Sequence, residues 1–187
     1  RSSPGLVWAP RIRFGGLLDV PDAEGETRAQ APIAGLAVDL LSPGSAERRT
    51  LNLDAALRRG RLPAARGEAL LSDALFERLG LRLGETVTLI SSTSWGSIAT
   101  ANVAVTGTVR FGVSAMDRGA MLLDLADAQG ALDMEDAAAE VLGLFPDGIY
   151  RAEEARAVAA AFDAGGHGEG ELARVMADLR RQPGRAP

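Results

Sequence analysis

The segment ALLSDALFERLGLRLGETVTLI, residues 69–90, changes its hydrophobic period within a few positions. Leu75 and Leu79 are four residues apart, and this spacing places them on one face of a helix. Val87 and Leu89 alternate with threonines, which is the pattern of a half-buried strand. Because almost no chain separates the two patterns, the helix must deliver the chain directly into a sheet.

The junction between helix and strand is built from glycines and polar residues. Gly80 can adopt a positive φ and end the helix, and Gly84 with Glu85 can turn the chain into the strand. Ser72 is expected to cap the start of the helix by accepting a hydrogen bond from a free amide, and Asp73 adds a favourable negative charge there. These residues determine the path of the chain, and we predict no reaction chemistry at the junction.

Further short elements are predicted on both sides of this segment. Strands are expected at residues 6–18, 31–41, 69–71, 86–90, 103–109, 120–125 and 140–145, with Trp8 of the first strand in the core. Helices are expected at residues 52–59 (between Asn52 as N-cap and Gly60), 73–79, 124–131 (with Asp124 as N-cap), 152–162 and 172–179. Segment 19–30 is expected to be a loop or a hairpin tip, and segment 42–49 a loop. The strands on both sides of residues 91–101 are expected to form a hairpin.

The order of these elements predicts an α+β fold. The strand-rich middle of the chain, residues 49–125, is expected to be an inserted β-rich subdomain. Both ends of the chain, residues 1–48 and 126–187, are expected to form a mixed α/β subdomain around it.

Composition excludes several classes of protein. Hydrophobic residues make up 47% and charged residues 24% of the 187 positions, which is typical of a globular domain. The net charge of -5 argues against a nucleic-acid-binding protein, which usually carries a basic face. The absence of cysteine excludes disulfides, thiol catalysis and cysteine-ligated metals. No apolar run is long enough for a transmembrane helix. The first and last residues look like cut points in a longer protein.

Carboxylates and the single histidine offer weak candidates for chemistry. His167 lies in a glycine-rich linker with Glu169 and Glu171, and these three could form an open metal site, although a solvated linker is the favoured interpretation. Acidic pairs are expected to be solvated or to sit at helix starts. They are Asp22 with Glu24, Asp133 with Glu135 and Asp136, and Glu153 with Glu154.

Motifs for nucleophilic catalysis and nucleotide binding are missing from the sequence. The serines near residues 91–97 have no histidine nearby in sequence, and there is no nucleophile elbow, P-loop or dinucleotide fingerprint. The arginines around Pro63 are expected to form a solvated helix end. They are Arg58, Arg59, Arg61 and Arg66. We therefore expect neither an enzyme nor a cofactor.

Trp95 is the most informative single residue. It lies at the predicted hairpin tip with Ile98, among serines, threonines and glycine. The ring either folds back onto the sheet or is offered to a partner, and tryptophan is over-represented among binding hot spots. The candidate partner-binding residues are Ser94, Trp95, Ser97 and Ile98.

An ordered series of motifs over residues 31–132 resembles the MacB-like periplasmic core domain, found in permeases of the MacB, FtsX and LolC/LolE group of ABC transporters. Upstream, the short strand ending in Val38-Asp39 and the Gly60-Arg61 helix end match the family pattern. The other matching positions, in chain order, are Gly67, Leu79-Gly80, Gly84-Glu85, Val105 to Gly107, Asp117, Met121 to Leu123 and Ala128-Gln129.

This resemblance implies a non-catalytic extracytoplasmic, or periplasmic, domain of a membrane protein. In the family, a cytoplasmic ATPase drives movement of a permease dimer, and the domain couples that movement to export or to lipoprotein release. The implied partners are the ATPase, a second permease protomer and a lipoprotein or periplasmic protein. The family divides the domain into a Porter-like part, matching residues 1–48 and 126–187, and a Sabre-like part, matching residues 49–125.

Two features put limits on the resemblance. In lipoprotein-releasing members the tip corresponding to residues 91–102 holds a chaperone, but this tip is shorter and lacks the proline-bearing sequence and any arginine. The helix, Gly-acidic turn and strand also occur in double-psi β-barrels of cytoplasmic enzymes. That alternative predicts a closed barrel with a second copy of the same unit, and the sequence shows no second copy.

Overall fold

A computed structural model describes residues 6–164, and these residues form a mixed sheet with short helices. The strands are β1 (Val7–Pro21), β2 (Thr27–Val38), β3 (Leu57–Gly60), β4 (Glu68–Ser72), β5 (Thr86–Ser92), β6 (Ile98–Val109), β7 (Ala120–Asp124) and β8 (Glu140–Leu144). The helices are α1 (Ala46–Thr50), α2 (Leu53–Ala56), α3 (Asp73–Arg78), α4 (Ser114–Asp117), α5 (Leu125–Ala131) and α6 (Ala152–Ala164). The predicted α+β class is confirmed.

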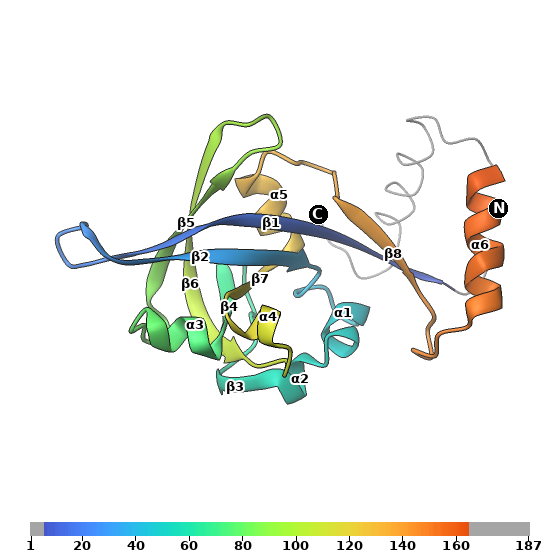
Figure 1. The fold of residues 1–187 in the computed structure, drawn as a ribbon, viewed down its shortest axis with the longest axis horizontal. Coiled ribbons are helices and arrows are strands. Elements are labelled where there is room, and N and C mark those ends of the chain that lie inside the picture. Colours follow the sequence, from blue (N-terminus) through green and yellow to red (C-terminus); the bar gives the residue numbers. More distant parts are fainter. Residues whose placement is uncertain (1–5, 165–187) are drawn as a thin grey trace.

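Six of the strands close into a ring (Figure 1). Around the ring the order is β1, β2, β7, β4, β6 and β5, and β5 pairs with β1 again. The β2–β7 and β4–β6 pairs are parallel and the other four are antiparallel. β3 pairs with the end of β6, and β8 pairs with the start of β1. Closure gives each ring strand two neighbours, which removes the exposed edges of an open sheet.

The core is aliphatic and lies on both faces of β4 and β7. Leu71 and Met121 belong to the larger cluster of buried residues, together with side chains of α3 and α5. Leu70 and Leu122 point the opposite way, because successive strand residues alternate between faces. They join a smaller cluster that α2 covers through Leu53. The two strands are therefore buried on both faces, and they form the most enclosed part of the molecule.

The segment whose period changes folds largely as predicted. Leu75 of α3 and Leu79 just beyond it are buried, and so is Val87 of β5. Gly80 has a φ of +61° and Gly84 a φ of +84°, so both glycines adopt the backbone conformation that the junction requires. The helix therefore ends, and the strand begins, where the sequence indicates.

The predicted capping role of Ser72 is wrong. Its side chain makes no capping hydrogen bond, and its buried hydroxyl has no hydrogen-bond partner among the described residues. Ser72 is the last residue of β4 and pairs in register with Val109, so the strand fixes the direction of its side chain. Asp73 instead accepts a hydrogen bond from the Thr108 hydroxyl at 2.7 Å.

The helix predicted for residues 52–59 is also wrong. α2 ends at Ala56, and Asn52 has a φ of 49° and makes no side-chain cap. Residues 57–60 form β3 because they pair with β6, which overrides their helix propensity. In the predicted loop 42–49, Ser45 caps α1. Segment 19–30 forms a hairpin tip, one of its two predicted alternatives: β1 and β2 continue into it, and the turn is residues 22–26.

β1 extends beyond the ring at its start. Residues Val7–Arg11 pair with β8, and this two-stranded ribbon leads away from the ring towards α6 (Figure 1). We call Val7–Arg11 together with residues 140–164, which contain β8, the turn after it and α6, the arm. Trp8, predicted in the core, is only half-buried, because a two-stranded ribbon cannot enclose a ring of this size. Its ring lies against Gly143 of β8.

The predicted subdomains contribute strands to the same ring. β1 and β2 come from residues 1–48, whereas β4, β5, β6 and β7 come from residues 49–125. The boundary at residues 48 and 49 therefore passes through a hydrogen-bonded ring, and the division into two subdomains stays a prediction. Over residues 6–164, no helix has the length and apolar character needed to span a bilayer.

Candidate functional site

The tip of the β5–β6 hairpin is narrower than predicted. The strands continue to Ser92 and resume at Ile98, which leaves residues 93–97 as the turn. The Thr93 amide donates to the Ser97 carbonyl at 2.8 Å, and the Gly96 amide donates to the Thr93 carbonyl at 3.0 Å. Gly96 has a φ of +84°, which lets the chain reverse within so few residues. The tip is therefore a tight, hydrogen-bonded turn.

The two large apolar side chains of the tip point into solvent. Trp95 and Ile98 are each 82% exposed, so the ring of Trp95 is not folded back onto the sheet. No charged residue occurs between residues 91 and 101. Exposed apolar groups gathered at one projecting point are typical of contact surfaces. The assignment of the tip as a partner-binding site stays a prediction.

Ser94 holds the tip against the end of α5. Its amide donates to the Leu132 carbonyl at 3.0 Å, and its hydroxyl donates to the Asp133 carbonyl at 2.9 Å. Leu132 is itself buried in the core. Ser94 therefore uses its polar groups within the chain and positions Trp95. No local pattern in the sequence indicates this link, because it joins residues 39 positions apart.

The acidic pairs named from the sequence lie in turns or at a helix start. The Asp22 carboxylate accepts from the amides of Glu24 at 3.0 Å and Glu26 at 2.8 Å, and so it closes the β1–β2 turn. Glu153 and Glu154 lie in the first turn of α6, as expected. Within residues 6–164 no group of three or more His, Cys, Asp or Glu residues is arranged to hold a metal ion. The remaining acidic candidates are Asp133 and Asp136, both with positive φ, and Glu135.

The metal-site candidates His167, Glu169 and Glu171 lie outside the described residues. The helix predicted for residues 172–179 lies outside them as well.

Three of the arginines around Pro63 form ion pairs, and the group is not a helix end. Arg59 lies in β3 and pairs with Asp73 at 3.0 Å and with Glu77. Arg66 pairs with Asp127 at 2.5 Å. Arg58 is exposed. These contacts connect β3 and its loop to α3 and α5, which is a structural role.

Glu68 is the most strongly perturbed carboxylate of this group. The Arg61 guanidinium is the main cause, and with the amides of Ala64 and Ala65 it lowers the pKa of Glu68 to about 2. The side chain of Glu68 is 15% exposed, so this ion pair is partly shielded from solvent. The ionised carboxylate thus fixes the loop that precedes β4.

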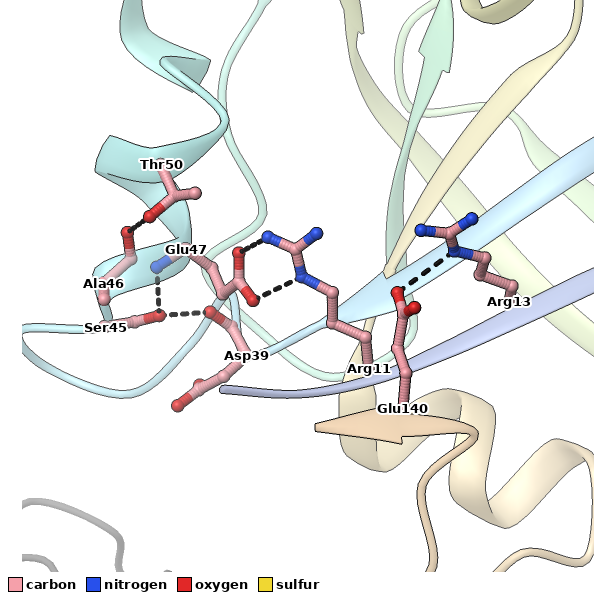
Figure 2. Close-up of polar contacts among 8 residues, drawn as sticks. All are labelled: Arg11, Arg13, Asp39, Ser45, Ala46, Glu47, Thr50 and Glu140. Carbon is pink, nitrogen blue, oxygen red and sulfur yellow. Dashed lines mark hydrogen bonds and ion pairs between the residues drawn. The ribbon is translucent and has the colours of Figure 1, made fainter. Parts of the chain in front are cut away.

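A buried ion pair between β1 and α1 was not predicted. Arg11 Nε and Nη2 each donate to one oxygen of the Glu47 carboxylate at 2.7 Å (Figure 2). Glu47 is 1% exposed and Arg11 is 8% exposed. Such two-point pairing is strong and directional. The only signal in the sequence is a pair of arginines, Arg11 and Arg13, among apolar residues near the start of the strand, and it does not identify the partner.

Asp124 caps α5 as predicted and also holds the end of β2. Its carboxylate accepts from the Ala126 amide at 3.1 Å and from the Leu40 amide at 3.0 Å. Burial raises the pKa of Asp124 above its usual value, the neighbouring carboxylates of Asp39 and Asp127 add to this, and the two amides oppose it. Both oxygens are occupied by backbone donors, which is the arrangement of a structural group.

Comparison with known proteins shows the fold. No family model matches the sequence, and no curated protein matches it. The crystal structure of the periplasmic region of MacB from Actinobacillus actinomycetemcomitans matches with a TM-score of 0.58 at 12% sequence identity. The match covers 87% of this chain and 69% of that one. The predicted resemblance to a MacB-like periplasmic domain is thus supported at the level of fold.

Proposed function

We propose that this chain is the extracytoplasmic domain of an ABC transporter permease subunit and has no catalytic role of its own. The observation that carries the proposal is the fold shared with a transporter's periplasmic region over 87% of the chain. The ordered motif series in residues 31–132 points to the same family independently of the structure. The domain would lie outside the cytoplasmic membrane, in the periplasm of a cell with two membranes.

In this role the domain couples ATP-driven movement of the permease to export or to lipoprotein release. Its partners are the cytoplasmic ATPase, which acts through the parent permease, and a second permease protomer. The exposed tip adds contact with a substrate, a lipoprotein or a periplasmic protein. Trp95 and Ile98 make that contact, and Ser94 and Ser97 shape the turn that presents them.

The placement of the arm supports insertion of the domain into a membrane protein. The start of β1 and helix α6 lie at the same end of the molecule. The β1–β2 tip lies at the opposite end (Figure 1). A domain held in the loop between two membrane spans needs both of its connections on one side. The arm would then face the membrane, and the ring and its hairpin tips would project from it.

The topology of the full-length protein tests this proposal. We expect one transmembrane helix before Arg1 and three after Pro187 in the encoded protein. A reporter that is active only outside the cytoplasm, inserted in the β1–β2 turn at Gly25, should be active in intact cells. A reporter that is active only in the cytoplasm should be silent at the same position. The opposite pattern, or the absence of these flanking helices, would overturn the proposal.

The closed ring bears on the alternative, a double-psi-barrel-like domain of a cytoplasmic enzyme. Closure is what that alternative predicted, and a strand followed directly by a helix occurs twice, as β4–α3 and β7–α5. After α5, however, the chain leaves the ring and continues to β8 in the arm. The turn formed by Gly84 and Glu85 thus has no second copy that leads into a ring strand. Because a transporter domain shares the fold, closure by itself does not favour an enzyme.

A further inference from the structure

The arm joins the ring through one continuous strand. β1 changes partners between Arg11, which is opposite Glu140 of β8, and Ile12, which is opposite Ala37 of β2. The ribbon of β1 and β8 has two strands, and isolated two-stranded ribbons are at best marginally stable in water. A further contact is therefore needed to fix the direction in which the arm leaves the ring.

Helix α1 supplies that contact from the side of the ring. It follows the end of β2, and Ser45 fixes its first turn by donating to the Asp39 carbonyl at 2.5 Å and accepting from the Glu47 amide at 3.2 Å (Figure 2). Two of its side chains reach the arm. Glu47 receives both hydrogen bonds from Arg11, and Arg49 donates to the Pro146 carbonyl at 3.2 Å, in the turn that follows β8.

The buried pair of Arg11 and Glu47 is suited to fix an angle. Removing two charges from water opposes most of their attraction, so such a pair adds little net stability compared with an apolar pair of similar size. Its fork geometry, however, is satisfied in only one alignment of the two side chains. A more exposed pair between Arg13 and Glu140, at 3.0 Å, joins β1 to β8 near the same point of β1.

We propose that α1, through the Arg11–Glu47 ion pair and the Arg49 contact, is a rigid joint that fixes the angle between the arm and the ring. The arm and the ring then turn as one body, and a rotation at the arm displaces the distant hairpin tips. The use of this joint to carry movement rests on the proposed function. The rigidity itself is a property of the domain and is measured without a transporter.

A distance measurement within the domain tests the joint. The chain contains no cysteine, so single cysteines at the exposed positions Thr100 in β6 and Ala157 in α6 accept spin labels without background. Pulsed electron paramagnetic resonance on the 187-residue chain then gives the distribution of distances between ring and arm. The test variant carries Arg11→Met with Glu47→Leu, which replaces the buried charges with apolar groups of similar volume.

A matched control uses the ion pair between Arg48 and Asp54, which joins α1 to α2 without contacting the arm. It also joins an arginine to a carboxylate by two-point pairing, but it is more than half exposed, with side-chain values of 56% and 67%. The control variant carries Arg48→Met with Asp54→Leu.

We expect the test variant to fold and to show a distance distribution about twofold wider than the parent, since the apolar pair is compatible with several alignments. The control should match the parent. An unchanged width in the folded test variant would overturn the proposal. If that variant does not fold, Arg49→Ala serves as the test variant, because Arg49 is exposed and its replacement leaves the core intact. A wider distance distribution in Arg49→Ala supports the joint, and an unchanged one overturns it. Neither result depends on membrane topology, so failure of the joint and failure of the proposed function are distinguishable.

Discussion

The two long hairpins of the ring end in tips of opposite character. The β1–β2 tip, residues 22–26, contains three carboxylates and no large apolar side chain, and Asp22 closes it through two backbone hydrogen bonds. The β5–β6 tip, residues 93–97, contains no charge and leaves Trp95 and the adjacent Ile98 in solvent. An acidic tip is stable in water without a partner, whereas exposed apolar side chains gain free energy when a partner covers them. The difference identifies the β5–β6 tip as the better candidate for binding.

Replacing the exposed ring is the strongest test of this comparison. In the proposed transporter we expect Trp95→Ala to lower cargo export or release by about tenfold or more, since truncating a hot-spot tryptophan commonly costs about 2 kcal/mol or more. Glu24→Ala at the acidic tip is the matched control and should leave transport unchanged. The melting temperatures of both variants should equal that of the parent, because both side chains are exposed. Normal transport by Trp95→Ala would remove the contact role of this tip.

The stability of the domain that carries both tips is expected to depend on pH through Glu68. Because the folded pKa of Glu68 is about 2, below its usual value of 4.5, its ion pair stabilises the fold fully above about pH 5. That contribution declines as the pH falls from about 4.5 to about 2. We therefore expect Glu68→Gln to destabilise the domain at pH 7 by about 1.5–3 kcal/mol, the range for hydrogen bonds to charged groups.

The difference between Glu68→Gln and the parent should shrink at pH 3. Thermal unfolding of both proteins at the two pH values measures it. A constant difference would show that the Arg61–Glu68 pair does not contribute through its charge. Binding experiments that compare the two tips should accordingly be made above about pH 5, where this ion pair is intact.

The smallest expected effect concerns how the apolar tip is held. Ser94→Ala removes the hydroxyl that donates to the Asp133 carbonyl, and a hydrogen bond of this kind contributes about 1 kcal/mol. In Ser94→Ala we expect faster hydrogen exchange at the amide of residue 94. We also expect a transport loss smaller than that of Trp95→Ala. Ser97→Ala is the control, because no hydrogen bond of its hydroxyl contributes to the described turn. Equal exchange in both variants would mean that the link to α5 does not position Trp95.

Local features of the fold were predictable where neighbouring residues decide them. Gly80 ends a helix and Gly84 turns the chain because each adopts a positive φ on its own. Asp124 caps α5 through an amide two positions away. The projecting hairpin was visible in the alternation of Val87 and Leu89 with threonines. Each of these depends on a few consecutive residues, which the sequence presents directly.

Features that depend on distant residues were missed or left open. Residues 57–60 form a strand because β6 provides the partner, although the local sequence favoured a helix. Ser72 does not cap α3 because its strand register points the hydroxyl elsewhere. For Trp95 the sequence permitted both a folded-back and an exposed ring. In the structure the ring is exposed, and the hydrogen bond from Ser94 to the Asp133 carbonyl holds the turn that carries it.

The sequence by itself determined the class of fold, the helix that leads into a strand, and the uncharged apolar composition of one hairpin tip. These follow from backbone preferences and from the spacing of apolar residues, which act over a few positions. Only the tertiary structure decided that six strands close into a ring, and that Arg11 finds Glu47 across 36 positions. It also decided that Trp95 and Ile98 point away from the molecule. Such pairings are selected by the shared burial and hydrogen bonding of distant segments, which no local pattern encodes.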